Sequence, residues 1–388
     1  MTMRGAFLVL MLGMLLAAAP VARACNVPVF RFALERWESD NYVMVIAHDV
    51  PLTPAQQQSV DKLAALSSEN GGKANLTVQV LDLVATPDDP AGEHLPLTGA
   101  TLPAAFLFYP AGFGTPTLVW QTPLVAENLQ DLAGSPVRDE FVAQVTKGCT
   151  AAWLLLESGD RAADDRAEQL LRESLTAAEQ DLALPPGVVH PSGAVTGDEF
   201  APKDNGYFDP ENQLDSGIPL RIAFDVIRLS ASEPREAVLR GMLLHTAPGL
   251  MEKRSQPMAF PLFGRGRILQ PLVGEEIQTS NIAAIARYLC GPCSCQVKRQ
   301  NPGVDMLLEM DWETKLAGVS AIQDRELPPL TGTAALTEEA PASQPAAGAP
   351  PQPVLDGGHP VLRVGMWLAA AVLVLVFSAT MWMLRKSR

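Results

Sequence analysis

The sequence predicts a mixed α/β fold that is built twice and is followed by one C-terminal transmembrane helix. A proline, an apolar strand, a glycine turn, a second strand and a helix occur in this order after Pro103 and again after Pro257. Each of these two units is preceded by a continuous apolar stretch and a segment with helical periodicity. With 388 residues, the chain is long enough for two domains of ordinary size.

The first half begins with the apolar residues 42–47, which are typical of a strand buried on both faces. Residues 53–56 then have the pattern of a helix N-cap, a first-turn proline and a capping-box glutamine. Residues 76–80 alternate between apolar and polar side chains and predict a half-buried strand. A helix over residues 136–148 follows the Pro103 unit and ends at a glycine.

The second half repeats this order with an insertion. Residues 151–156 predict a buried strand, and residues 161–182 predict a long amphipathic helix. Residues 185–217 are polar and rich in glycine and proline, so we expect an irregular insertion. An alternating strand over residues 222–226 leads to the second proline unit and to a helix over residues 281–289.

The connections indicate how the strands pair. A helical crossover requires parallel pairing of the first two strands of each half, and a glycine turn favours antiparallel pairing of the last two. This order, over residues 41–148 and 151–291, resembles the thioredoxin fold. The resemblance implies two thioredoxin-like domains in tandem, over residues 25–148 and 149–325. It also implies a cis peptide bond before Pro103 and Pro257, as before the third strand in that family.

The resemblance bears on chemistry as well as on fold. Catalytic thioredoxins carry Cys-x-x-Cys where the helix after the first strand begins, because the helix N-terminus stabilises the thiolate. The matching positions, residues 50–53 and 159–162, contain no cysteine. Both halves therefore resemble the non-catalytic domains of protein disulfide isomerases, which implies binding or spacing.

Cys290-Gly-Pro-Cys293 has the thioredoxin string in a different context. It follows a helical pattern, so Cys290 is expected near a helix C-terminus, where the helix dipole disfavours a thiolate. With Cys295, three interpretations stay open: a structural disulfide or buried thiols, which we prefer, a redox-active pair, or a copper(I) or zinc site. The other cysteines are Cys25 and Cys149, and because five is an odd number at least one is free or pairs between chains.

Other polar motifs give no catalytic, cofactor or metal residue. Arg265 and Arg267 flank the glycine of the second hairpin, where we expect a solvated tip in preference to a small anion site. Residues 204–209 carry oxygen ligands without EF-hand spacing and predict a turn-rich loop. The histidines are scattered and form no catalytic pattern: His48, His94, His190, His245 and His359.

Both ends of the chain carry membrane signals. Residues 1–24 have a basic start, an apolar run and an Ala-x-Ala motif, as in a cleaved signal peptide. Residues 364–384 are uncharged and span about 31 Å as a helix, which matches a hydrocarbon core of about 30 Å. We therefore expect a transmembrane helix over residues 361–385 and, because basic residues follow it, a cytoplasmic tail at 386–388. The intervening residues 326–360 are rich in proline and alanine and predict a disordered linker.

The net charge and a second family resemblance limit the classes of function that we expect. The formal net charge of −14 argues against nucleic acid as a partner. Cys-Asn-Val-Pro-Val-Phe-Arg at residues 25–31, together with residues 154–160, 293–298 and 301–303, resembles a family of uncharacterised bacterial envelope proteins. We expect a protein of the inner membrane with a periplasmic ectodomain that binds or positions an envelope protein partner. The alternatives are a thiol-disulfide oxidoreductase using Cys290 and Cys293, or a metal-handling protein using the same cysteines.

Overall fold

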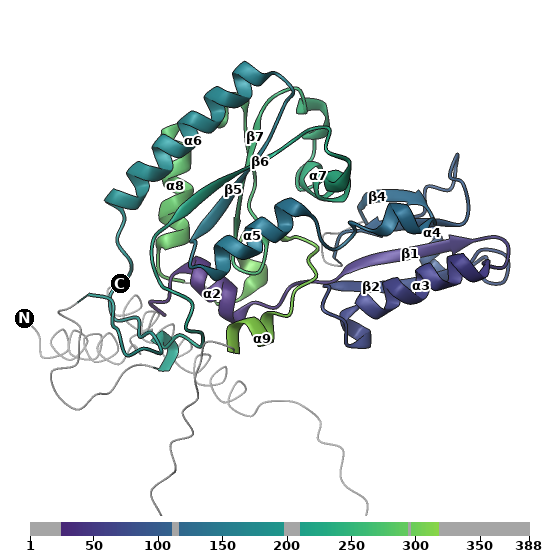
Figure 1. Cartoon of the computed structure of the whole chain (residues 1–388), viewed down its shortest axis with the longest axis horizontal. Coiled ribbons are helices and arrows are strands. Elements are labelled where there is room, and N and C mark those ends of the chain that lie inside the picture. The colour runs from purple at the N-terminus through teal and green to yellow at the C-terminus, as the bar shows by residue number, and fades with distance from the viewer. Residues whose placement is uncertain (1–24, 111–115, 198–209, 294–295, 318–388) are drawn as a thin grey trace, which may run out of the picture. The chain divides into compact units, whose positions relative to one another are not determined.

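The computed structural model describes residues 25–110, 116–197, 210–293 and 296–317, and they form a mixed α/β structure with two sheets, as predicted (Figure 1). The predicted signal peptide, linker and transmembrane helix lie outside these residues, as do Cys295 and residues 204–209. Within the described ranges, no helix is both long and apolar enough to cross a membrane.

The first sheet has four strands in the order β2-β1-β3-β4. Its strands are β1 (Tyr42–His48), β2 (Leu76–Asp82), β3 (Ala104–Phe108) and β4 (Leu118–Pro123). The helix α3 (Pro54–Leu66) connects β1 to its parallel neighbour β2, whereas β3 pairs antiparallel with both β1 and β4. The predicted capping box is present: Thr53 Oγ1 accepts from the Gln56 amide at 3.3 Å, and Gln56 Oε1 accepts from the Thr53 amide at 2.9 Å.

The second sheet follows the same scheme, with β5 parallel to β6 and antiparallel to β7. Its strands are β5 (Ala151–Leu156), β6 (Phe224–Leu229), β7 (Met258–Phe263), β8 (Arg267–Ile268), β9 (Leu272–Val273) and β10 (Val304–Asp305). The strand expected after the glycine turn is split into β8 and β9, and both pieces pair with β7. Pro271 lies between them, and a proline has no amide hydrogen to continue a ladder.

Helices cover both sheets. They are α4 (Pro90–Glu93), α5 (Pro136–Thr146), α6 (Arg161–Asp181), α7 (Ala237–Leu244), α8 (Thr279–Cys290) and α9 (Trp312–Ala317). The apolar faces of α6 and α8 pack together on one face of the second sheet, around Trp153 (Figure 1). Helix α6 begins at Arg161, five residues after β5 ends at Leu156.

The N-terminal helix α2 (Val29–Arg36), which the sequence analysis did not predict, packs on the second half of the chain. Its apolar side chains share a core cluster with Phe263 of β7 and Leu289 of α8. Gly264 lies against the helix so closely that a Cβ there would be 2.7 Å from Ala33 Cβ. The segment that begins the described chain therefore completes the core of its second half.

The two halves share one core, and the described residues form one compact unit. Helix α7 lies on β4, where a Cβ on Gly241 would be 2.6 Å from the Val119 carbonyl oxygen. The first turn of α5 is capped by the second half, since Glu236 Oε1 accepts from the Val137 amide at 2.9 Å. Residues 304–310, here named the strap, pass from β8 of the second sheet to residues that border β2 of the first.

Candidate functional site

The cysteine at the end of α8 is buried and has a raised pKa. Cys290 and Cys149 are buried, free thiols, and burial raises the pKa of each to about 12. Cys149 Sγ also donates to the carbonyl oxygens of Ala151 at 3.2 Å and Ala223 at 3.3 Å. Because the thiolate is the nucleophile, such thiols hold almost no reactive form at neutral pH.

Cys25 and Cys293 lie in the core cluster that α2 forms with the second half. Their segments run antiparallel, and the Cys293 amide donates to the Val27 carbonyl at 2.9 Å. Cys25 Sγ lies 3.4 Å from the Glu211 carbonyl oxygen. Both side chains are buried in this cluster. Within the described residues, no group of three or more histidine, cysteine, aspartate or glutamate side chains is arranged to hold a metal ion.

The expectation of a solvated tip at Arg265 and Arg267 is wrong. Arg267 is 6% exposed and forms an ion pair with Asp305, with 3.0 Å between Nη1 and Oδ1. Arg265 donates to the carbonyl oxygens of Leu34 at 2.8 Å and Glu35 at 3.0 Å. These are carbonyl groups at the C-terminal end of α2, which lack partners within a helix. Both guanidinium groups are therefore satisfied by the protein itself, which leaves no anion site there.

The helix starts at which a reactive cysteine was sought carry capping residues. Asp160 Oδ1 accepts from the amides of Ala162 at 3.0 Å and Ala163 at 3.2 Å, as Thr53 does in the first half. The Leu102–Pro103 peptide bond is cis. The bond before Pro257 is trans, which differs from the expectation at that residue.

A cavity of about 450 Å³ opens at the carboxyl end of β5, and we name it the β5-end cavity. It is bordered by the ends of β5 and β6, by α7 and by the loop before β7. Its lining residues are Leu156, Glu157, Ser158, Ala231, Arg240, Leu244, Met251, Arg254 and Ser255. The cavity thus brings together the loop between β5 and α6 and the loop that leads to Pro257. A crevice beyond the carboxyl ends of parallel strands is a common place for a ligand.

The two arginines of this cavity differ. Arg240 Nη1 donates to the carbonyl oxygens of Ser230 and Glu233, and burial lowers its pKa. Arg254 is exposed, and within the described residues its guanidinium group makes no hydrogen bond or ion pair. Leu156, Leu244 and the exposed Met251 supply apolar surface beside it. The cavity therefore offers a free cation next to an apolar wall.

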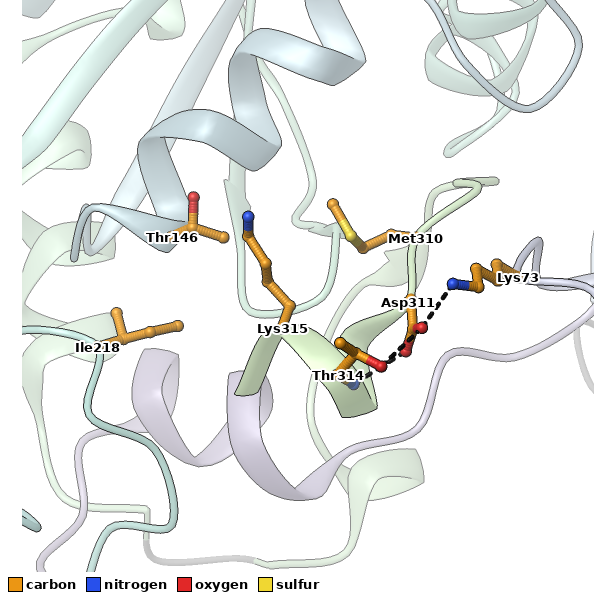
Figure 2. Close-up of a pocket in the computed structure, with 7 residues that line it drawn as sticks. All are labelled: Lys73, Thr146, Ile218, Met310, Asp311, Thr314 and Lys315. Carbon is orange, nitrogen blue, oxygen red and sulfur yellow. Dashed lines mark hydrogen bonds and ion pairs between the residues drawn. The ribbon is translucent and has the colours of Figure 1, made fainter. Parts of the chain in front are cut away.

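A second cavity, of about 480 Å³, lies beside the start of α9 (Figure 2). Lys73 Nζ is 2.6 Å from Asp311 Oδ2, and this contact together with Thr314 lowers the pKa of Asp311 to about 2. Figure 2 shows Lys315 extending toward Thr146. Lys315 is exposed and, within the described residues, its ammonium group forms no ion pair, so this cavity also holds a cation beside the apolar Ile218 and Met310. The β5-end cavity differs in its position, at the carboxyl ends of the parallel strands β5 and β6.

No protein-family model matches the chain, and no curated protein matches it either. The geometry of the β5-end cavity therefore carries the functional argument. Sequence analysis identified the start of α6 and Pro257 but missed Arg254 and Met251. The available signal was their position, within six residues before Pro257.

Proposed function

We propose that this protein is a binding or scaffold protein of the bacterial envelope without enzymatic activity of its own, which aids the assembly or folding of envelope proteins. In this proposal each half is a thioredoxin-like unit, and one C-terminal helix anchors the chain in the inner membrane with the body in the periplasm. The strand orders β2-β1-β3-β4 and β6-β5-β7, with β8 and β9 beyond, support the first part. The sequence signals at both ends support the second.

The observation that carries this proposal is the β5-end cavity. In a thioredoxin-like unit, its lining residue Ser158 directly precedes the positions, residues 159–162, where a catalytic domain would hold its reactive cysteines. Here that place has Ser158 and the capping residue Asp160, while Cys290, buried at the end of α8, has a raised pKa. The site has what binding requires, a cavity with an unpaired charge and apolar surface, and it lacks a nucleophile for thiol exchange.

The lining of the cavity favours one chemistry of partner. An arginine without a partner recognises a carboxylate through charge-assisted hydrogen bonds. Leu156, Leu244 and Met251 favour an apolar side chain next to that carboxylate. We therefore assign to this site an extended segment of another protein that carries an acidic group beside an apolar residue.

Fluorescence anisotropy with short labelled peptides tests this assignment on the full-length chain in detergent. Peptides that pair leucine or phenylalanine with a terminal carboxylate should bind, and their C-terminal amides should bind about tenfold more weakly, a difference of about 1.4 kcal/mol. Arg254→Gln should cause a similar loss. The matched control is Arg299→Gln, because Arg299 is also exposed but lies outside the cavity.

Two results would refute the proposal. Equal binding of acid and amide peptides, or equal effects of the two arginine variants, would remove the assigned role of Arg254. Turnover in an insulin-reduction assay that is lost on Cys290→Ser would replace the binding function by thiol-disulfide exchange.

A further inference from the structure

The first sheet ends at β2, and no strand in the described residues pairs with the outer side of that strand. The register with β1 shows which backbone groups point outward. The Tyr42 amide donates to the Asn75 carbonyl, and the Leu83 amide donates to the His48 carbonyl, so odd-numbered residues of β2 bond to β1. Even-numbered residues therefore direct their amide and carbonyl groups away from the sheet.

The chain itself covers both ends of this edge. Ser67 Oγ donates to the Leu76 carbonyl at 2.7 Å, and the Thr86 amide donates to the Asp82 carbonyl at 2.9 Å. Between them, Val78 and Val80 make no backbone hydrogen bond on their outer side to any described residue. Two amides and two carbonyls in a row are thus open to a further strand.

The side chains along this edge do not protect it. Exposed edge strands usually carry lysine, proline or a bulge that discourages pairing. Here Val80 is 50% exposed, and Val84, just beyond the strand, is 71% exposed. The edge has the β-branched composition that pairs well and lacks the residues that prevent pairing.

The charge around the edge selects an occupant. Residues 74–137 contain six acidic side chains and no lysine or arginine. The acidic residues are Asp82, Asp88, Asp89, Glu93, Glu127 and Asp131. Asp82 is the last residue of β2, and Asp88, Asp89 and Glu93 lie within the next eleven residues, where α4 is held near β2 because a Cβ on Gly92 would be 3.4 Å from Leu81 Cδ2. Asp49 directly follows the parallel β1, so acidic residues follow the carboxyl ends of both strands. A second copy of the chain would bring the same negative charge to this edge, which disfavours self-pairing.

We propose that the outer edge of β2 binds a basic, extended segment of a partner protein as an additional strand of the first sheet. The open groups of Val78 and Val80 would supply main-chain hydrogen bonds, and alternate apolar side chains of the segment would pack beside Val80. Its basic side chains would face the carboxylates at the end of β2, which raises the association rate and makes the affinity sensitive to salt. This site is independent of the β5-end cavity, which takes a partner of the opposite charge.

The probe is a labelled peptide of four Lys-Val repeats, measured by anisotropy with the full-length chain in detergent. It should bind at least tenfold more tightly than a Glu-Val counterpart and than versions N-methylated at alternate residues in either register. Amide hydrogen exchange at Val78 and Val80 should slow when the peptide binds.

Val80→Pro is the sharpest variant, because it removes an outward amide that the pairing with β1 does not use. Val80→Lys adds a repelling charge and tests the edge without proline. Each should weaken binding at least tenfold, whereas Val125→Lys, at an exposed valine away from β2, should leave it unchanged. Asp49→Asn, Asp88→Asn and Glu93→Gln together should reduce the affinity and its salt dependence. The matched control combines Glu140→Gln, Glu252→Gln and Glu275→Gln, at exposed residues outside 74–137, and should change both less.

The inference is overturned if the N-methylated peptides bind as well as the parent, since pairing by the backbone would then be absent. Unchanged affinity in both Val80 variants would overturn it too. A dimer that dissociates on Val80→Lys would show that the occupant is a second copy of this chain and would refute the basic partner.

Discussion

Replacing Arg138 by methionine is expected to lower the free energy of unfolding by about 4 kcal/mol. Arg138 is fully buried in α5 and donates five hydrogen bonds, four of them to backbone carbonyl groups. Methionine fills a similar volume but donates nothing. Five bonds at about 1 kcal/mol each give about 5 kcal/mol, and removal of a buried charge offsets part of that.

One of these bonds connects the two halves of the chain. Arg138 Nη1 donates to the Leu307 carbonyl of the strap at 3.0 Å, and the next amide, that of Leu308, donates to Asn75 Oδ1 at 2.8 Å. Loss of the guanidinium group should therefore speed hydrogen exchange at the Leu308 amide. Exchange followed by mass spectrometry or NMR would measure this local effect separately from global stability.

Urea unfolding followed by tryptophan fluorescence measures the global effect. With an m-value of about 3 kcal/mol/M, a loss of 4 kcal/mol lowers the midpoint by about 1.3 M. The control is Arg235→Gln, which removes an exposed arginine that pairs with Asp131 and should leave the midpoint unchanged. A shift below about 0.3 M for Arg138→Met would refute the reasoning, because it would mean that the freed carbonyl groups find other donors.

Three further predictions concern the thiols and the contact between α7 and β4. At pH 8, iodoacetamide should leave Cys290 unmodified in the native protein and alkylate it in urea, as mass spectrometry of digests would show; rapid native alkylation would contradict its burial. The raised pKa values of Cys149 and Cys290 mean that these thiols ionise at a lower pH in the unfolded chain than in the folded one. The free energy of unfolding should therefore fall as the pH rises from about 9 toward 12, by about 1.4 kcal/mol per thiol at pH 10. Cys290→Ala should show a smaller fall. Gly241→Ala should lower the free energy of unfolding by about 1–3 kcal/mol, because its Cβ would lie 2.6 Å from the Val119 carbonyl oxygen. Gly134→Ala, at a position with open space around it, should leave the stability unchanged. Equal urea midpoints for the two variants would exclude close packing between α7 and β4.

The candidate site was only partly accessible to sequence analysis. The start of α6 and Pro257 follow from local patterns, namely an apolar strand, a cap and a proline before a strand. Arg254 and Met251 carry no such pattern, because they lie in a loop whose position depends on β5, β6 and α7 together. Only the folded chain shows that they line one cavity with Leu156 and Ser158, which lie about a hundred residues earlier in the sequence.

The sequence by itself determined the order of most elements and the pairing of the first strands of each half, because caps, periodicity and connection length act over a few residues. The capping box at Thr53 and the parallel pairing of β1 with β2 are of this kind. Tertiary structure alone decided where α2 packs and what surrounds Arg265 and Arg267. Arg265 bonds to carbonyl groups 230 and 231 residues away, and whether an arginine meets water or a helix end depends on such distant contacts, which no local pattern encodes.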